Sequence, residues 1–218
     1  MQNTSIKTIL NSGGIIAISR GNYGSPLLNA VEAILSAGVR AVEVTFEQNA
    51  DWRETGRSIS ALVDRFGTEM TIGAGTVLTL DQLRLASDSG AKYIVSPNTD
   101  AKIIAETKSL GLGSIPGAMT PSEIVAAHSF GADVVKVFPA GALGAAYFAA
   151  VTTPLAHIRC AAVGGVTVAN LPAFKKAGAC AFGISSSILN NQLIAEGRFG
   201  ELRSNAAAFA AAARAKPD

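Results

Sequence analysis

Short apolar runs alternate with amphipathic helical patterns along almost the whole chain. The runs are rich in β-branched residues and lack strict hydrophobic–polar alternation. Eight of them are predicted strands, within residues 15–19, 41–46, 70–74, 93–95, 112–115, 131–140, 160–163 and 181–184. Helical patterns separate these runs, and glycine closes most of the helices. Strands of this kind, separated by helices, are typical of a parallel sheet whose two faces are both covered.

Eight strand–helix units without a domain-sized break predict one α/β domain over residues 1–218. The expected fold is a (β/α)8 TIM barrel, with a short additional helix at residues 4–10. Ser25 and Pro26 are expected to open the helix after the first strand, and residues 120–123 form a predicted capping box. An open doubly wound sheet is the alternative, but no Gly-x-Gly-x-x-Gly opens the first helix to support dinucleotide binding.

The composition and charge of the chain argue against several classes of binding partner. Hydrophobic residues make up 49% of the chain, and the net charge is only +2, without a basic run of the kind that binds nucleic acid. The longest apolar runs, such as residues 206–213, are too short to span a membrane. Cys160 and Cys180 form no metal-ligand pattern with the histidines, and residues 1–5 do not resemble a signal peptide. We therefore expect a cytoplasmic protein with buried free thiols and no bound metal.

A lysine stands in the middle of the apolar stretch 131–140. Burial disfavours the charged form of an amine, because desolvation lowers its pKa. A lysine in such a position is often a nucleophile that forms a Schiff base with a carbonyl group. Alternatively, Lys136 extends its amine from the strand end into solvent. The stretch alone leaves both interpretations open.

Polar residues on other predicted strands share the expected inner face with Lys136. Side chains alternate along a strand, and barrel active sites lie at the carboxyl ends of the strands. Counting by twos places four polar residues together: Lys136, Glu43, Arg20 and, in line with Ile72 and Ala74, Thr76. This pattern predicts an amine and a carboxylate in one site of low dielectric constant. A buried ion pair without a catalytic role is the alternative.

Two glycine- and serine-rich loops follow the last two predicted strands, at residues 163–166 and 183–187. In this class of barrel the loops after strands seven and eight commonly bind phosphate through backbone N–H groups. The alternative is ordinary turn chemistry. A third glycine-rich segment, residues 72–77, is a poor strand end unless another group packs closely on its backbone.

Taken together, these pieces resemble the bacterial 2-keto-3-deoxy-6-phosphogluconate (KDPG)/4-hydroxy-2-oxoglutarate (KHG) aldolase family. The similarity extends over residues 16–188. Six motifs carry it: Glu43-Val44-Thr45, Gly73-Ala74-Gly75-Thr76-Val77, Val95-Ser96-Pro97, Pro116-Gly117, Lys136-Val137-Phe138-Pro139 and Gly164-Gly165-Val166. The resemblance implies a class I aldolase without a metal or cofactor, usually a homotrimer. The implied products are pyruvate and glyceraldehyde 3-phosphate, or pyruvate and glyoxylate from 4-hydroxy-2-oxoglutarate.

The resemblance also implies roles for nine residues. Lys136 would form the Schiff base, and Glu43 would be the general acid and base. The remaining roles are a carboxylate site at Arg20 and Thr76, a methyl-facing wall at Pro97 and Phe138, and a phosphate site at Gly164, Gly165 and Ser186.

Several positions depart from the phosphogluconate pattern. Glu47 stands where many members carry an arginine, and its parity with Glu43 predicts that it faces the site. Ser185 replaces a common glycine. Val163 and the Ile-x-Arg-Gly motif ending at Gly21 look more like the 2-keto-3-deoxy-6-phosphogalactonate (KDPGal) branch. Two other functions stay open from the sequence: a phosphate-binding barrel isomerase or synthase without a Schiff base, and a non-catalytic phosphosugar-binding barrel.

Overall fold

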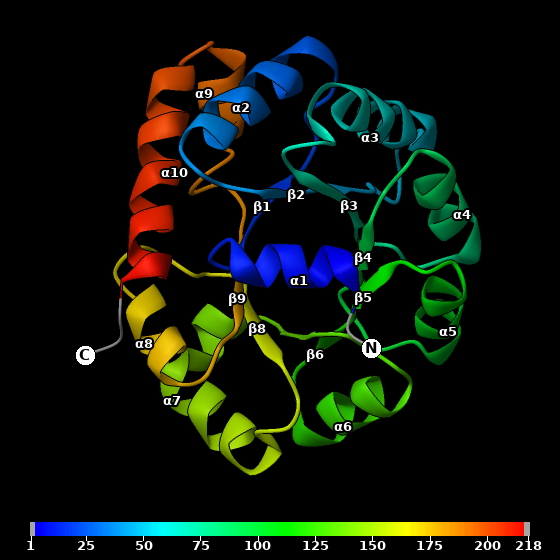
Figure 1. Cartoon of the computed structure of the whole chain (residues 1–218), viewed down its shortest axis with the longest axis vertical. Coiled ribbons are helices and arrows are strands. Elements are labelled where there is room, and N and C mark those ends of the chain that lie inside the picture. Colours follow the sequence, from blue (N-terminus) through cyan, green and yellow to red (C-terminus); the bar gives the residue numbers. More distant parts are fainter. Residues whose placement is uncertain (1–2, 216–218) are drawn as a thin grey trace.

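The computed structural model describes residues 3–215, which form a parallel β-barrel surrounded by helices (Figure 1). Its nine strands form a single sheet in the order β5-β4-β3-β2-β1-β9-β8-β7-β6. Their bounds are β1 Ile15–Ser19, β2 Ala41–Thr45, β3 Thr71–Gly75, β4 Tyr93–Val95, β5 Gly113–Ile115, β6 Gly117–Ala118, β7 Val135–Val137, β8 Cys160–Val163 and β9 Ala181–Ile184. The predicted barrel architecture is confirmed.

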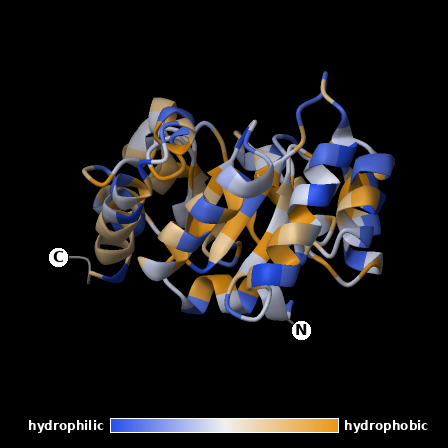
Figure 2. Cartoon of the chain, turned by 90° about the horizontal axis from the view of Figure 1, so that it is seen from above, coloured by the Kyte–Doolittle hydropathy of each residue, from blue (hydrophilic) through white to orange (hydrophobic). Residues whose placement is uncertain are grey.

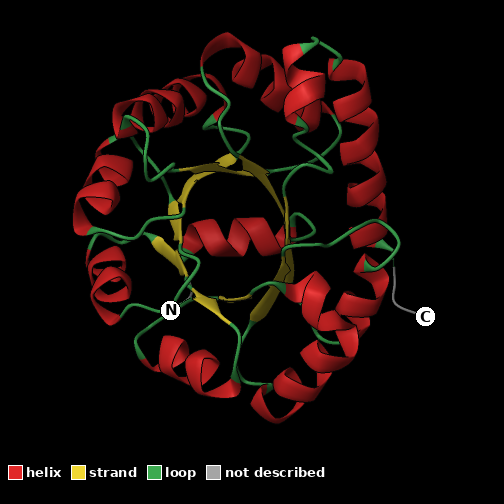
Figure 3. Cartoon of the chain, turned by 180° about the vertical axis from the view of Figure 1, so that it is seen from behind, coloured by secondary structure: helices red, strands yellow, loops and turns green. Residues whose placement is uncertain are grey.

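The ninth strand arises from one proline. Pro116 separates β5 from β6, and proline has no N–H to contribute to a sheet. β5 pairs with β4, whereas β6 pairs with β7, so the two halves of one segment join the two ends of the sheet. The carbonyl of Pro116 still accepts a 2.8 Å hydrogen bond from the backbone N–H of Lys136. The strands consequently form a ring, as the view from behind shows (Figure 3).

Ten α-helices occur within residues 3–215. They are α1 Thr4–Asn11, α2 Gly24–Ser36, α3 Trp52–Phe66, α4 Leu80–Asp88, α5 Ala101–Ser109, α6 Pro121–Ser129, α7 Ala140–Thr152, α8 Leu171–Lys176, α9 Asn191–Ala195 and α10 Phe199–Arg214. The capping box of α6 is present as predicted, with Thr120 accepting from Glu123 N–H. Two expectations were wrong: Tyr23 rather than Ser25 occupies the N-cap position of α2, and the lysine strand is shorter than expected. The sequence analysis made no prediction for the segment that forms α9.

Two apolar cores hold the barrel together. The outer core lies between the sheet and the surrounding helices. Figure 2, which colours each residue by hydropathy, shows hydrophobic residues on the strands inside the molecule. The inner core fills the barrel and includes Ile6 and Ile9 of α1, which are 1% and 2% exposed. α1 therefore closes the amino-terminal end of the barrel, in the centre of Figure 1. The opposite end, where the strands terminate, is left for a site.

The remaining sequence expectations concern surfaces and thiols. No helix among residues 3–215 is both long and apolar enough to cross a membrane. Cys160 and Cys180 are both free thiols. Cys160 is buried as expected, but Cys180 is partly exposed because it precedes β9 at the barrel end rather than lying inside the strand.

Candidate active site

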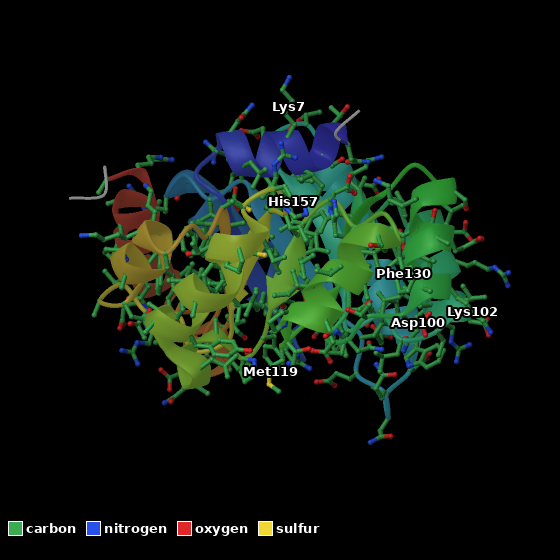
Figure 4. The ribbon with its side chains drawn as sticks, turned by 90° about the horizontal axis from the view of Figure 1, so that it is seen from below. Lys7, Asp100, Lys102, Met119, Phe130 and His157 are labelled. Carbon is green, nitrogen blue, oxygen red and sulfur yellow. The ribbon has the colours of Figure 1, made fainter. Side chains whose placement is uncertain are left out.

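A cavity of about 290 Å³ opens at the carboxyl ends of the strands. Figure 4 places Lys7 of α1 and Met119, which follows β6, at opposite ends of the barrel, and the cavity lies at the Met119 end. All nine residues singled out from the sequence line it: Arg20, Glu43, Thr76, Pro97, Lys136, Phe138, Gly164, Gly165 and Ser186. The barrel thus brings together side chains from six different strand ends.

Lys136 and Glu43 are the two buried ionisable groups of the cavity, 7% and 3% exposed. Burial lowers the pKa of the Lys136 amine; the charge of Glu43 opposes this effect and that of Arg20 adds to it. Burial likewise raises the pKa of the Glu43 carboxyl, against the influence of the two cations. Both shifts move the two groups toward their neutral forms, which increases the nucleophilicity of the amine and suits the carboxyl group to proton exchange.

The Lys136 amine also contacts an aromatic face. Its Nζ lies 5.0 Å from the centre of the Phe138 ring. The ring belongs to the segment that leaves β7, where the Phe138–Pro139 peptide bond is cis. Lys136 therefore points into the cavity from inside the barrel and does not extend into solvent, the alternative that the sequence left open.

Two glycines of β3 make room for the large inner side chains. An ideal Cβ on Gly75 would lie 1.6 Å from Oε1 of Glu43, and one on Gly73 would lie 2.4 Å from Cζ of Tyr93. The glycine-rich segment is therefore packed closely by neighbouring groups, as its sequence predicted. Gly75 in particular determines where the Glu43 carboxylate can lie.

Thr76 reaches the cavity for a reason that strand parity did not predict. Ile72 and Ala74, which share its parity, face the outer core, whereas Gly73 and Gly75 face inward. Thr76 faces the cavity because its φ is +55°, which turns the chain at the end of β3. This conformation is rare for a β-branched residue and persists only where surrounding contacts fix it.

Two glutamines supply such contacts. Gln48 Nε2 donates to the carbonyl of Thr76 at 3.1 Å, and Gln82 Nε2 donates to Gln48 Oε1 at 2.9 Å. Gln82 is fully buried, and its Oε1 accepts from the N–H groups of Leu78 and Thr79. The glutamine pair thus ties the loop after β2 to the loop that carries Thr76. Sequence reasoning missed both glutamines. Gln82 is the third residue of the Thr79–Gln82 capping box that opens α4, a pattern that marks a helix start and not a site, and Gln48 belongs to no motif.

Hydrogen bonds to the backbone of Arg20 fix its position at the rim of the cavity. The carbonyl of Arg20 accepts hydrogen bonds from Asn22 Nδ2 and Asn191 Nδ2, both at 3.1 Å. Glu47 does not line the cavity, contrary to the expectation from parity. Strand β2 ends at Thr45, so alternation no longer governs position 47, and its Oε1 lies 3.1 Å from the Cβ position of Gly21.

The loops after β8 and β9 form the other wall. Gly164 and Gly165 have φ values of +85° and +72°, and the carbonyl of Gly164 accepts a 2.7 Å hydrogen bond from Gly141 N–H. Side chains would clash at both glycines, against Phe138 at one and Gly141 at the other. Ser186 is exposed at the cavity mouth. Thr167 also lines the cavity, and the sequence gave no signal for it.

A barrel with a buried amine and a buried carboxylate in one cavity defines an enzyme of the (β/α)8 class that is suited to carbonyl chemistry. Residues 6–204 match the family model "KDPG and KHG aldolase". The chain is 36% identical to 2-dehydro-3-deoxy-6-phosphogalactonate aldolase of Escherichia coli over 175 residues, which cover 80% of this chain and 83% of that protein. It is 33% identical to 2-dehydro-3-deoxy-phosphogluconate aldolase of Treponema pallidum, covering 72% of this chain and 71% of the relative.

A solved native KDPGal structure superposes with a TM-score of 0.83 at 35% identity, covering 92% of this chain and 94% of the other. The chain therefore belongs to the KDPG and KHG aldolase family. It is a class I, pyruvate-dependent carbon–carbon lyase.

Proposed function

We propose that the enzyme cleaves 2-keto-3-deoxy-6-phosphogalactonate to pyruvate and glyceraldehyde 3-phosphate. The observation that carries this proposal is the convergence of the buried Lys136 and Glu43 in one cavity. Two features favour the galactonate configuration. Relatives with that name are 36% and 34% identical to the chain, and Val163 and Arg20, both typical of that branch in the sequence, line the cavity.

We assign the covalent step to Lys136. Its neutral amine attacks C2 of the keto acid, and uptake of one proton with loss of water leaves a protonated imine. The imine accepts the electron pair of the breaking C3–C4 bond and becomes an enamine. Glu43 takes the proton of the C4 hydroxyl as the aldehyde leaves, and it then returns a proton to C3. Water hydrolyses the imine, releasing pyruvate and the free amine. Proton transfer of this kind contributes about 10²–10⁴-fold.

The other residues bind and orient the substrate in this proposal. Arg20 and Thr76 hold the C1 carboxylate, because they bring a guanidinium and a hydroxyl to one side of the cavity. Pro97 and Phe138 cover the side where the pyruvate methyl group forms. Gly164, Gly165 and Ser186 bind the distal phosphate, since the two glycine backbones are open to close approach and the serine adds a hydroxyl.

Assembly and location belong to the same proposal. We infer that the enzyme acts in the cytoplasm as a homotrimer and that residues 1–218 form one domain. The free thiols of Cys160 and Cys180 fit a reducing compartment. Sedimentation analysis of the purified protein tests the assembly, and a monomer at micromolar concentration would contradict it.

A retro-aldol assay tests the substrate. Pyruvate release is followed with the phosphogalactonate, the phosphogluconate, unphosphorylated 2-keto-3-deoxygalactonate and 4-hydroxy-2-oxoglutarate. The proposal predicts the highest kcat/KM for the phosphogalactonate and a large loss without the phosphate. A Ser186→Ala variant should raise KM for the phosphorylated substrate more than for the unphosphorylated one. A higher kcat/KM for the phosphogluconate would assign the enzyme to the other branch.

A further inference from the structure

Tyr93 is a buried ionisable residue that the proposed mechanism leaves unused. It is 0% exposed on β4, and its hydroxyl has no hydrogen-bond partner among residues 3–215. The other members of the inner core are aliphatic. A phenylalanine would fill the same space without a buried hydroxyl, and an unpaired hydroxyl in an apolar core is costly.

The strand register places Tyr93 beside the acid–base residue. Glu43 pairs with Gly73 on β3, and Gly73 pairs with Tyr93 on β4. Paired residues of parallel strands share a face, so all three lie in one inward-facing row. Gly73 has no side chain, and the ring of Tyr93 lies over it.

The contacts with β3 place the two side-chain ends over neighbouring inward positions of that strand. Cζ of Tyr93 lies 2.4 Å from the Cβ position of Gly73, and Oε1 of Glu43 lies 1.6 Å from that of Gly75. These two positions are one inward repeat apart on β3, about 6.6 Å at roughly 3.3 Å per residue. A water molecule that hydrogen-bonds to two groups spans about 5.6 Å. The two side-chain ends therefore lie over neighbouring inward positions of one strand without a direct hydrogen bond, an arrangement in which one bridging water can join them.

The bonding needs of the two groups are complementary. Among the described residues, burial and the charges of Lys136 and Arg20 shift the pKa of the Glu43 carboxyl, and no hydrogen-bond donor contributes to that shift. Tyr93 has a donor without an acceptor, and Glu43 is the charged group that acts on it. Each residue therefore lacks what the other supplies.

We propose that Tyr93 is a positioning residue for Glu43, whose carboxylate it holds through a hydrogen bond relayed by one water molecule. The proposal rests on the proposed role of Glu43 as acid and base. A donor favours the ionised carboxylate, which is the form that accepts the C4 hydroxyl proton. It also fixes the carboxylate against Gly75. The groups that face Glu43 are then Lys136 from β7, Arg20 after β1 and Tyr93 from β4.

A Tyr93→Phe variant tests this role, because it keeps the ring against Gly73 and removes only the hydroxyl. The acid limb of the pH profile of kcat should move to higher pH by about one unit, since the carboxylate loses a stabilising donor. Imine formation with pyruvate should be unchanged. Tyr147→Phe is the matched control: its hydroxyl donates to the carbonyl of Met119 at 2.6 Å outside the cavity, and its removal should leave the limb in place.

Two results would overturn the proposal. One leaves the proposed function intact, and the other contradicts the proposed function as well. If Glu43→Gln removes the acid limb but Tyr93→Phe leaves it in place and raises the melting temperature, the hydroxyl is simply unpaired. Tyr93 then has no positioning role, while the proposed function stands. If Glu43→Gln keeps the acid limb, Glu43 is not the base, and the proposed mechanism fails together with this inference.

Discussion

Oε1 of Glu43 occupies the space in which any side chain at position 75 would begin, 1.6 Å from the ideal Cβ of Gly75. Gly75→Ala should therefore displace the carboxylate without touching the lysine. We expect kcat to fall by about 10²-fold or more, comparable to the loss in Glu43→Gln, because both remove the acid–base group from its place. Borohydride trapping of pyruvate should persist in both variants. Steady-state kinetics and mass spectrometry check the two parts.

Gly200→Ala provides the matched control for this substitution. Gly200 lies on α10, and an added Cβ there would meet nothing within 4 Å. The variant should keep full activity and should not lose stability, because alanine is a better helix former than glycine. If Gly75→Ala is as active as Gly200→Ala, the carboxylate is not confined as its contacts indicate.

The glutamine pair behind Thr76 makes a separate prediction. Gln48→Ala removes the donor to the Thr76 carbonyl, so the strained turn at φ +55° loses one of its restraints. We expect KM for the keto acid to rise severalfold with a smaller change in kcat, because carboxylate binding is affected more than chemistry.

A double-mutant cycle with Thr76→Ala tests whether Gln48 acts through Thr76. If it does, Gln48→Ala should add little to the effect of Thr76→Ala, and the two losses should be clearly non-additive. Fully additive losses would show that Gln48 influences the site by another route.

The charges of Glu43 and Arg20 should shift the pH midpoint of imine formation at Lys136 in opposite directions when each is removed. Imine formation requires the neutral amine, whose pKa is lowered by burial, raised by the Glu43 charge and lowered by the Arg20 charge. In Glu43→Gln the pH midpoint of imine formation should therefore fall, because a negative charge that favours the ammonium form is removed. In Arg20→Gln it should rise. Stopped-flow measurement of imine formation against pH checks both signs, and shifts in one common direction would refute this electrostatic account.

Much of the barrel and its site followed from local pattern. Glycine and capping signals marked the helices, and alternation along strands correctly placed Lys136, Glu43 and Arg20 at one cavity. Alternation succeeded there because Lys136 and Glu43 lie within regular strands, and Arg20 follows β1 without the positive φ that turns the chain at Thr76. These residues are far apart in the sequence, and the closure of the barrel brings them to one cavity.

The errors occurred where the backbone leaves regular geometry. Thr76 was assigned to the inner face from the parity of Ile72 and Ala74, yet those residues face outward and a positive φ brings Thr76 inward. Glu47 lies beyond the end of β2, so its parity carried no information. The Gln48–Gln82 contact joins the loop after β2 to the first turn of α4 and depends on tertiary structure, which single-sequence patterns do not encode.

Covalent trapping tests the central claim most directly. The purified enzyme is incubated with pyruvate and borohydride, and the modified residue is located by peptide mass spectrometry. The account predicts one pyruvate-derived adduct per chain, on Lys136, absent from Lys136→Ala and still formed by Glu43→Gln. Turnover of the keto acid without any adduct, or an adduct that survives Lys136→Ala, would contradict it.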